Sequence, residues 1–540
     1  MSTTARAFVY AAHLVLAASA VAQSAIINPT DYEAAGKLWW SHIQYLAGDE
    51  LQGRQTGSEG YNKGAAYVVE HFKQYGLKPA GIEGFFQPVR FDVTRVLADQ
   101  SSAALINKGI TEPLAIGPDI LLGSRLIEPA VIDAPMVFIG YGLHMPDVHY
   151  DDFADIDLKG KVIVYINGGP ADVSAALKSH ARAAEFAKTA AAAGAVAAIG
   201  IPIPRGMDIP WPRQILLSTQ QRMRLADADM QTPGPIVTAT FNPANAEKLF
   251  SGSGHTFAEI LSLANEGKPL PRFPLNLSLR AKVVTENEKA VSPNIIGKLE
   301  GSDPTLKDQY VLVSAHLDHI GVGEPIGGDK IYHGAMDDAS GVASVLEIAH
   351  TIVASHFQPK RSILFVIFTA EEKGLLGSHF FAEHPSVPKS SIAGDINMDM
   401  FLPLYPLHYV MVQGVNESTL GDTARAVAKT SGYEVTTDPY PDRNSFVRTD
   451  QYSFVRAGIP ALSLKFGFAL GSPEQQKEKD WRTNRYHSPA DNLSQPVDKA
   501  AAAHFDEFMA ALAESIANDP VRPSWKPDSF FRRYAVTANK

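Results

Sequence analysis

The chain has 540 residues, of which 45% are hydrophobic and 20% charged, and its formal net charge of −10 comes from 58 acidic and 48 basic residues. Domains of typically about 150 residues predict about two to four domains, and an acidic balance without basic clusters argues against a nucleic-acid partner. The absence of cysteine excludes disulfides, thiolate metal ligands and cysteine nucleophiles. Any protein ligand for a metal ion must therefore be His, Asp or Glu.

The N-terminus has the layout of a secretory signal peptide. A mostly apolar run from Ala7 to Ala22 ends in the small-residue pattern Ala-Val-Ala. This pattern predicts a signal peptide over residues 1–22, cleaved before Gln23. A membrane span needs about 20 apolar residues, and this run is shorter. We therefore expect a secreted or periplasmic protein that has no membrane association after cleavage.

Two amphipathic helices are predicted at the start of the mature chain. Apolar residues recur at helical spacing over Tyr32–Leu46 and again over Tyr61–Tyr75, where Gly76 ends the pattern. The polar, glycine-bounded stretch 48–54 between them predicts a turn.

The pattern changes over residues 96–285. Short β-type runs, such as Met136–Ile139 and Val162–Ile166, alternate with loops and one alanine-rich helix over Ala175–Ala193. That composition suits a helix packed closely on a sheet. We interpret 96–285 as a separate mixed domain inserted into the first, and it holds no convergent cluster of His and carboxylates.

From about residue 290 the sequence predicts regular α/β structure. Strands are expected at Tyr310–Ser314, Ser362–Thr369, Ile392–Met398 and Ala461–Lys465, with helices at Gly341–Ser355, Thr419–Thr430 and Lys499–Ile516. Apolar strands alternating with helices indicate a mixed, mostly parallel sheet flanked by helices. The predicted catalytic domain is discontinuous, and a tail follows it; the ranges are 23–95 with 286–520, and 521–540.

Histidines and carboxylates follow the predicted strands, where the active site of such a sheet lies. His316-Leu317-Asp318-His319 follows the strand at 310–314, and Glu371-Glu372 follows the strand at 362–369. Each of these motifs alone is a weak signal, since Asp and Glu are common at helix starts. Jointly they point to cations, because neighbouring carboxylates would otherwise repel one another. Imidazole and carboxylate ligands together suit zinc, with cobalt or manganese as substitutes.

The chain resembles the M28 co-catalytic zinc peptidases, in the subgroup that carries an inserted protease-associated (PA) domain. The resemblance covers nearly the whole mature chain, with its blocks in the family's order and spacing. It implies a zinc-exopeptidase-like fold, a PA-like insertion at 96–285 and two zinc ions. The matching blocks are Leu46–Gly60, Ser292–Gly301, Tyr310–Gly323, Gly334–Gly341, Thr369–Ser378 and Tyr486–Asn492.

The resemblance implies a role for each residue of the proposed metal centre. His316 and Asp399 look like ligands of one zinc, and Glu372 and His487 like ligands of the other. Asp337 resembles the carboxylate that bridges both ions, followed by a cis peptide bond to the next aspartate. Two such ions polarise a carbonyl and lower the pKa of a bridging water.

Three further residues resemble catalytic positions of the family. Glu371 resembles the general base, which takes a proton from the metal-bound water and delivers it to the leaving amine. Asp318 resembles the carboxylate that accepts the second N–H of the His316 imidazole and fixes its tautomer. Tyr486 matches a tyrosine that assists the oxyanion. The chain departs from the family at Met336, where members usually carry Asp or Asn, and this change is expected to affect loop packing only.

Some polar residues near the motifs match no functional position. His319 and His333 correspond to no ligand of the family, and His333 is interpreted as a loop residue or a residue behind the ligands. Arg443, Arg448 and Asp450 fall in a loop near the pocket and are interpreted as solvated loop charges.

The sequence therefore predicts a secreted di-zinc exopeptidase acting on a peptide or small amide, most simply an aminopeptidase. The ligands themselves indicate only metal-assisted amide hydrolysis, so dipeptidase or carboxypeptidase activity on the same site stays open. Two other functions stay open as well: glutaminyl cyclisation, which single-zinc relatives perform on this fold, and a non-catalytic, receptor-like binding role. The oligomeric state and the preferred side chain stay undetermined.

Overall fold

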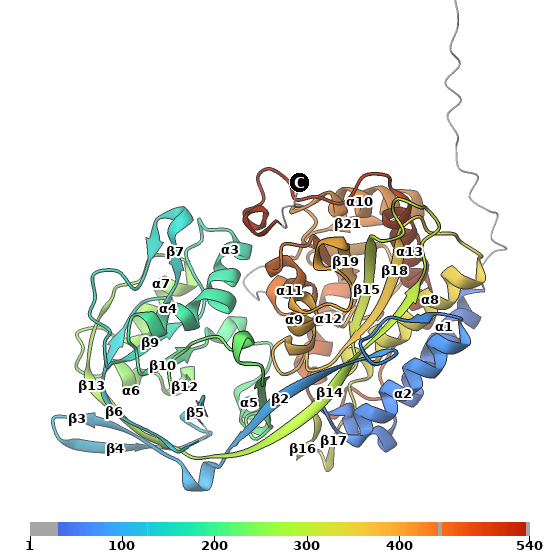
Figure 1. The fold of residues 1–540 in the computed structure, drawn as a ribbon. Coiled ribbons are helices and arrows are strands. Elements are labelled where there is room, and N and C mark those ends of the chain that lie inside the picture. The colour runs from blue at the N-terminus through green and yellow to red at the C-terminus, as the bar shows by residue number, and fades with distance from the viewer. Residues whose placement is uncertain (1–30, 127, 441–444, 536–540) are drawn as a thin grey trace, which may run out of the picture.

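The computed structural model describes residues 31–126, 128–440 and 445–535. These residues form two lobes, each built on its own sheet (Figure 1). The predicted signal peptide at 1–22 lies outside the described residues. None of the helices described is both long enough and apolar enough to cross a bilayer.

The larger lobe is built on a mixed sheet with strand order β11-β2-β14-β18-β15-β19-β22-β20-β21, and the short β1 also pairs with β14. The central strands β18, β15, β19 and β22 pair in parallel, whereas β14 and β20 join them antiparallel on either side. This confirms the predicted mixed α/β sheet, but parallel pairing is confined to the central strands and to β20 with β21. The bounds are β1 (Lys78–Pro79), β2 (Phe86–Val96), β11 (Arg222–Leu225), β14 (Thr285–Leu299), β15 (Tyr310–His316), β18 (Ser362–Phe368), β19 (Ile392–Asn397), β20 (Tyr409–Gln413), β21 (Glu434–Thr436) and β22 (Ala461–Gly467).

Helices cover both faces of this sheet (Figure 1). Val311 and Val313 of β15 pack in the core with α1, α2, α8 and α13, while Leu312 between them packs on the opposite face with α9 and α11. Alternate residues of a strand point to opposite faces, so a buried strand needs apolar residues throughout. The helices are α1 (Tyr32–Leu46), α2 (Glu59–Gln74), α8 (Ser340–Ala354), α9 (Leu376–Glu383), α10 (Thr419–Ser431), α11 (Gln451–Arg456), α12 (Pro473–Asn484) and α13 (Lys499–Asn518).

The smaller lobe has a second sheet with strand order β4-β3-β13-β6-β9-β10-β12-β5. All of these strands lie within the range 96–285 that the sequence analysis assigns to an insertion. The alanine-rich stretch is helical throughout, as α3, one π-helical turn at 181–185, and α4. The elements are β3 (Ser102–Asn107), β4 (Ile110–Leu114), β5 (Ile120–Ser124), β6 (Ala130–Phe138), β9 (Val162–Ile166), β10 (Ala197–Ile201), β12 (Val237–Phe241) and β13 (Phe273–Val283), with α3 (Ala175–His180), α4 (Phe186–Ala192), α5 (Trp211–Leu217), α6 (Glu247–Phe250) and α7 (Phe257–Asn265).

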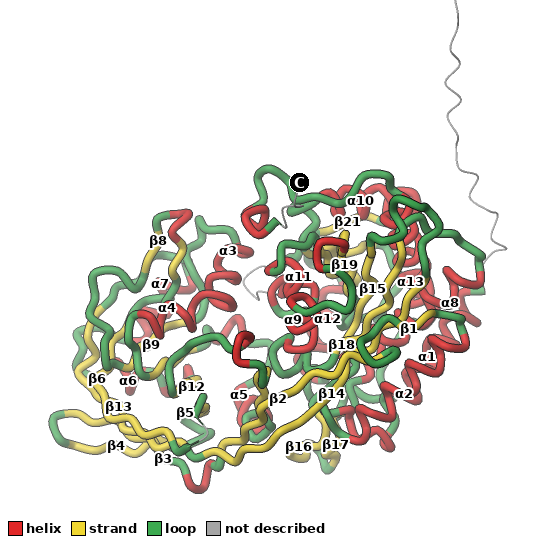
Figure 2. Tube along the Cα trace, viewed as in Figure 1, coloured by secondary structure: helices red, strands yellow, loops and turns green. Residues whose placement is uncertain are grey.

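The two lobes are joined by the long antiparallel ribbon of β2 and β14. The ribbon begins in the larger sheet and runs across to the smaller lobe (Figures 1 and 2). Strand β11, although it comes from the predicted insertion, pairs with β2 at the edge of the larger sheet. Two short hairpins complete the strands described: β7 (His144–Met145) with β8 (Tyr150–Asp151), and β16 (Gly321–Ile326) with β17 (Asp329–Tyr332).

The predicted tail contributes to packing up to residue 535. Trp525 and Phe531 are buried against the larger lobe, and the Trp525 indole donates to the carbonyl of Gly458 at 3.0 Å. Arg533 forms an ion pair with Asp147 of the smaller lobe at 2.8 Å. This segment therefore holds the lobes together as well as ending the chain.

Candidate metal centre

The ends of three neighbouring strands bring the predicted ligands together. His316 is the last residue of β15, Glu371 and Glu372 follow β18, and Asp399 follows β19. Because β18, β15 and β19 are parallel neighbours, their carboxyl ends meet at one edge of the sheet. His487 reaches the same place from the segment after α12.

Asp337 lies between two groups of ligand atoms. Its Oδ1 is 3.3 Å from Nε2 of His316, and its Oδ2 is 3.1 Å from Nε2 of His487. The two oxygens of one carboxylate thus face different imidazoles, which is the geometry needed to bridge two cations. The peptide bond from Asp337 to Asp338 is cis, as the resemblance implies.

The first group, called here the His316 group, consists of His316, Asp399 and Glu371. Nε2 of His316 is 3.8 Å from Oδ1 of Asp399 and 3.9 Å from Oε2 of Glu371. Ligand atoms of these three residues lie close enough to hold one metal ion. Proximity alone does not separate a ligand from a base beside the metal-bound water; the resemblance gives Glu371 the second role.

The second group, called here the His319 group, consists of His319, Glu372 and His487. Nδ1 of His319 is 2.7 Å from Oε1 of Glu372, and Nε2 of His487 is 3.1 Å from Oε2 of the same residue. The sequence analysis predicts Glu372 and His487 here but gives His319 no role. The sequence does not distinguish His319 from His333, because both lie close to predicted ligands along the chain. Only the fold directs the His319 ring toward Glu372.

The electrostatics of the two groups match a cation site. Burial raises the pKa of Glu371 well above its usual range, and the neighbouring carboxylates of Asp399 and Glu372 add to this rise. Burial lowers the pKa of His487, but Glu372 and Asp337 outweigh it and raise the value to about 9. A cation would relieve both conditions, because it stabilises carboxylates and displaces protons from imidazoles.

The burial and the chemical type of the ligand atoms fit a zinc ion. Nε2 of His316 and Oε1 of Glu372 are buried and have no hydrogen-bond partner among the residues that the structure describes. Buried polar atoms are rarely left without a partner, so such atoms converging on one point fit a binding site for a cation. Imidazole nitrogen with carboxylate oxygen is a ligand combination that zinc binds in proteins.

The orienting contact to His316 differs from the one predicted. Nδ1 of His316 lies 3.0 Å from the backbone oxygen of Asp318, whereas the Asp318 carboxylate is 3.9 Å away. The carbonyl therefore accepts the imidazole N–H and fixes the tautomer that leaves Nε2 for metal.

The Asp318 carboxylate instead holds the segment that carries the two glutamates. It accepts the backbone N–H groups of Glu371 at 3.0 Å and Glu372 at 3.3 Å, and the hydroxyl of Thr56 at 3.0 Å. The buried carboxylate thereby places the proposed base and a proposed ligand together.

The loop around Asp337 is held by two further carboxylates. Asp491 accepts the backbone N–H groups of Met336 and Asp337, and Asp338 accepts that of Gly341 at 3.0 Å. A Cβ on Gly341 would lie 2.3 Å from the Asp338 carboxylate, so the close approach requires glycine. Met336 is fully buried in the main core, which agrees with the packing role predicted for it.

Arg54 connects this loop to the N-terminal helices. Its fully buried guanidinium donates to the carbonyls of Leu317 at 2.8 Å, Leu46 at 2.6 Å, His333 at 2.7 Å and Gly334 at 2.9 Å. Burial lowers the pKa of Arg54 to about 10. The side chain is therefore still charged at neutral pH and ties the backbone on both sides of the metal-centre loops.

We predict that replacing Arg54 with methionine lowers the free energy of unfolding by at least about 4 kcal/mol, since each buried carbonyl left without a donor costs about 1–3 kcal/mol. Denaturant unfolding of the metal-loaded protein measures this loss. Arg90→Met is the control, because Arg90 is 69% exposed and pairs only with Asp227 at the surface. Equal stability of the two variants would contradict the role given to Arg54.

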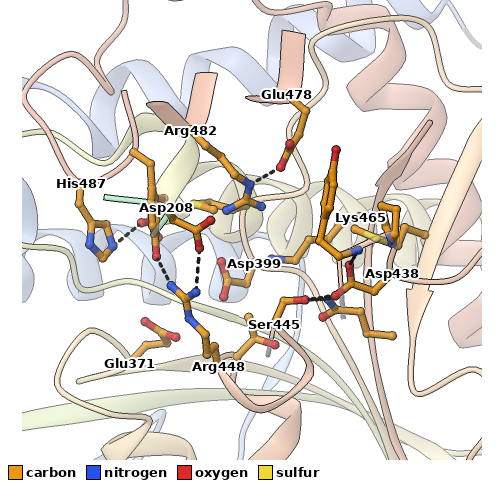
Figure 3. A pocket seen from close by; sticks show the side chains of 18 residues that line it. Asp208, Glu371, Asp399, Asp438, Ser445, Arg448, Lys465, Glu478, Arg482 and His487 are labelled. Atoms are coloured by element: carbon orange, nitrogen blue, oxygen red, sulfur yellow. Dashed lines mark hydrogen bonds and ion pairs between the residues drawn. The ribbon is translucent and has the colours of Figure 1, made fainter. Parts of the chain in front are cut away.

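A pocket opens over the metal centre and takes residues from both lobes (Figure 3). Asp208, from the smaller lobe, accepts from Nη1 of Arg448 at 2.9 Å, and Nη2 of Arg448 donates to the Tyr486 hydroxyl at 3.2 Å. A second pair, Glu478 with Arg482, lines the same pocket.

The interpretation of the loop charges as solvated is wrong for Asp450 and incomplete for Arg448. Asp450 is fully buried, and burial raises its pKa to about 7. Arg448 is partly exposed but engaged in the pocket contacts above. Arg443 lies outside the described residues. The signal for Asp450 was its place before the apolar segment Tyr452–Val455, which packs against the sheet.

Residues 294–513 match the model of peptidase family M28. A probable zinc metalloprotease of Pyrenophora tritici-repentis is 37% identical over 272 residues, covering 44% of this chain and 61% of the relative. A probable leucine aminopeptidase 2 of Aspergillus oryzae is 26% identical over 256 residues, covering 45% and 48%. The chain thus spans about half to three fifths of the length of these relatives.

The fold also matches a solved structure over nearly its full length. The aminopeptidase from Aneurinibacillus sp. strain AM-1 superposes with a TM-score of 0.52 at 20% identity, covering 92% of this chain and 97% of the other. At this identity the match establishes a shared fold.

Proposed function

We propose that this chain, whose residues 294–513 match the model of peptidase family M28, is a zinc-dependent exopeptidase with two zinc ions and Glu371 as general base. The single observation that carries the proposal is the position of Asp337, whose two carboxylate oxygens face His316 and His487 separately. A carboxylate buried between two imidazoles in this way is suited to bridge a pair of divalent ions.

The chain's own residues supply the binding and the proton transfer. His316 with Asp399 would hold one ion, Glu372 with His487 the other, and Asp337 both. Bound zinc polarises the scissile carbonyl and lowers the pKa of a water that it binds. Glu371 takes the proton of the attacking water and returns it to the leaving amine.

We infer that Tyr486 donates a hydrogen bond to the developing oxyanion. Its hydroxyl lines the pocket, and burial raises its pKa, so it keeps its proton at neutral pH. Because Arg448 donates to the Tyr486 oxygen, the hydroxyl hydrogen is left to point at substrate. Donors aimed at the place where charge develops stabilise the transition state.

We further propose that the enzyme removes N-terminal residues and acts outside the cytoplasm. Supporting the first point are the aminopeptidase names of a relative and of the structural match. Supporting the second is the signal-peptide pattern at 1–22. A PA-like identity for the insertion at 96–285 rests on the family resemblance.

The test is hydrolysis of a panel of free, N-blocked and C-blocked dipeptides by the purified mature chain, with and without a chelator. An aminopeptidase cleaves the free and C-blocked substrates and loses activity with the chelator. Preference for N-blocked substrates would instead assign a carboxypeptidase, and requirement for both free termini a dipeptidase. Cyclisation of N-terminal glutamine with one zinc per chain would assign a glutaminyl cyclase, and binding without turnover a receptor-like protein.

We predict that Asp208→Ala lowers kcat/KM by about tenfold, because Arg448 loses the partner that positions it at Tyr486. Steady-state kinetics on the best dipeptide of the panel measures the change. Asp133→Ala is the matched control, since Asp133 pairs with Arg280 on the surface of the same lobe. A kcat/KM within about twofold of wild type for both variants would mean that the smaller lobe does not shape the site.

A further inference from the structure

His319 is completely buried at the metal centre although the family resemblance assigns it nothing. Its exposed fraction is 0%, and it follows Asp318 by one residue. Nδ1 lies 2.7 Å from Oε1 of Glu372 and 3.8 Å from Oδ2 of Asp337. The imidazole thus faces the same two carboxylates as His487, whose ring centre is 5.7 Å away, but the other oxygen of Glu372.

Neither ring nitrogen of His319 makes a hydrogen bond within the part of the chain that the structure describes. The 2.7 Å contact of Nδ1 with Oε1 of Glu372 is an ion pair when the ring is protonated, but it lacks the geometry of a hydrogen bond, and with a neutral ring neither atom has a partner there. Two buried acceptor atoms this close, and not bonded to each other, are explained if both point at one cation. Around a tetrahedral zinc ion with bonds of about 2.0–2.2 Å, ligand atoms lie about 3.3–3.6 Å apart, so a bound ion would part this pair of atoms by under about 1 Å.

The fold holds the His319 ring in this place tightly. Its backbone N–H donates to the carbonyl of Arg54 at 3.3 Å, next to the buried guanidinium that ties the surrounding loops. Gly334, at a φ of +60°, leaves room for the ring, since a Cβ there would lie 2.6 Å from Cγ of His319. The backbone beside the metal centre is therefore shaped around this imidazole.

We propose that His319 is an additional ligand of the zinc ion held by Glu372, His487 and Asp337. The proposal rests on the proposed function, because it concerns the same metal centre. It makes the two sites unequal. The His319 group has three residues besides the shared Asp337, whereas the His316 group has one imidazole and Asp399 as ligands.

This inequality has a chemical consequence. A site with a full protein ligand set binds zinc tightly, whereas a catalytic site keeps a position open for water or substrate. The His319 group then holds the more tightly bound ion. The open position falls on the His316 group, beside Glu371.

The experiment is a zinc titration of the full mature chain against a chromophoric chelator, for wild type, His319→Ala and His319→Asn. We expect wild type to bind two zinc ions and His319→Ala to bind one of them at least about tenfold more weakly. Asparagine fills a similar volume and keeps a hydrogen-bond donor toward Glu372, so it should not restore affinity if the imidazole is a ligand. Near-ultraviolet circular dichroism of the zinc-free proteins verifies that each variant is folded.

X-ray absorption of the zinc-loaded proteins gives the second readout. The imidazole scattering per zinc should fall from wild type to either variant. Recovery of wild-type affinity by asparagine, or unchanged imidazole scattering, would overturn the proposal and leave His319 as a positioning residue. Unchanged zinc affinity in His319→Ala would overturn it outright.

His333→Asn is the matched control, because His333 is also buried beside these loops but contacts the carbonyl of Ala47 and the carboxylate of Asp329. We expect this variant to bind zinc as wild type does. Zinc binding is measured without turnover, so failure of the peptidase assignment would show in the dipeptide panel and leave the titration unaffected.

Discussion

Replacing Glu371 with glutamine is expected to lower kcat by about 100- to 10,000-fold while both zinc ions stay bound. Glutamine keeps the size of the side chain and loses the ability to carry a proton. The backbone N–H of Glu371 would still donate to Asp318, so the position of the neighbouring ligand Glu372 is unchanged. Steady-state kinetics together with zinc content per chain measures both parts of this expectation.

Glu383→Gln serves as the control for Glu371→Gln. Glu383 ends α9 and pairs with Lys389 at the surface, so its variant should turn over at the wild-type rate. If Glu371→Gln also kept the wild-type kcat, the general base would have to be another group. If it lost zinc together with activity, Glu371 would be a ligand in the His316 group.

Removal of zinc is expected to abolish hydrolysis and to destabilise the fold. Without cations, carboxylates of Asp337, Glu371, Glu372 and Asp399 stay crowded together in a buried site. An ion present at 1,000 times its dissociation constant stabilises the folded protein by about 4 kcal/mol. Because each occupied site adds such a contribution, the chelated protein should unfold at a clearly lower temperature.

The loss should grow with pH between about 6 and about 8. Burial raises the folded pKa of Glu371 and of Asp338, so these groups make the zinc-free protein less stable as the pH rises above the ordinary pKa of a carboxyl group. Burial lowers the pKa of His487, but the net effect of Glu372 and Asp337 raises it to about 9, so its contribution to stability is also lost as the pH rises. Zinc binding strengthens with pH because its ligands must be deprotonated.

Thermal unfolding with and without chelator at several pH values measures this difference. The gap between the two melting temperatures should widen from about pH 6 to about pH 8. Glu383→Gln, whose metal centre is unchanged, should show the same widening as wild type. A gap that is constant or narrows with pH would contradict the assignment of His487 as a metal ligand and of Glu371 as the base beside the metal.

Much of the larger lobe could be predicted from the sequence because its strands are buried on both faces. The run Ser362–Phe368 is apolar at nearly every position. Such a run is typical of a strand buried on both faces or of a buried helix, and its short length favours the strand. The helix Tyr32–Leu46 has the predicted bounds because its apolar spacing and its Asp31 cap are local signals. The β2 and β14 ribbon was not predicted, since much of it lies outside the core and has no continuous apolar run.

The part of the candidate metal centre that lies at the ends of predicted strands could be predicted from the sequence. His316 ends an apolar strand, Glu371 and Asp399 follow apolar strands within a few residues, and parallel strands end at one edge of their sheet. Their convergence thus follows from local patterns and one topological rule. His487 has no strand before it, and the family resemblance alone pointed to it.

The sequence by itself determined the residue types of the centre, because with no cysteine only imidazoles and carboxylates are available as ligands. The tertiary structure decided which polar residues near the motifs face inward. It turns the His319 ring toward Glu372, directs the Asp318 carboxylate to backbone N–H groups, and brings Asp208 from the other lobe to Arg448. The physical reason is that a side chain's direction depends on the backbone path and on partners distant in sequence, which spacing along the chain does not encode.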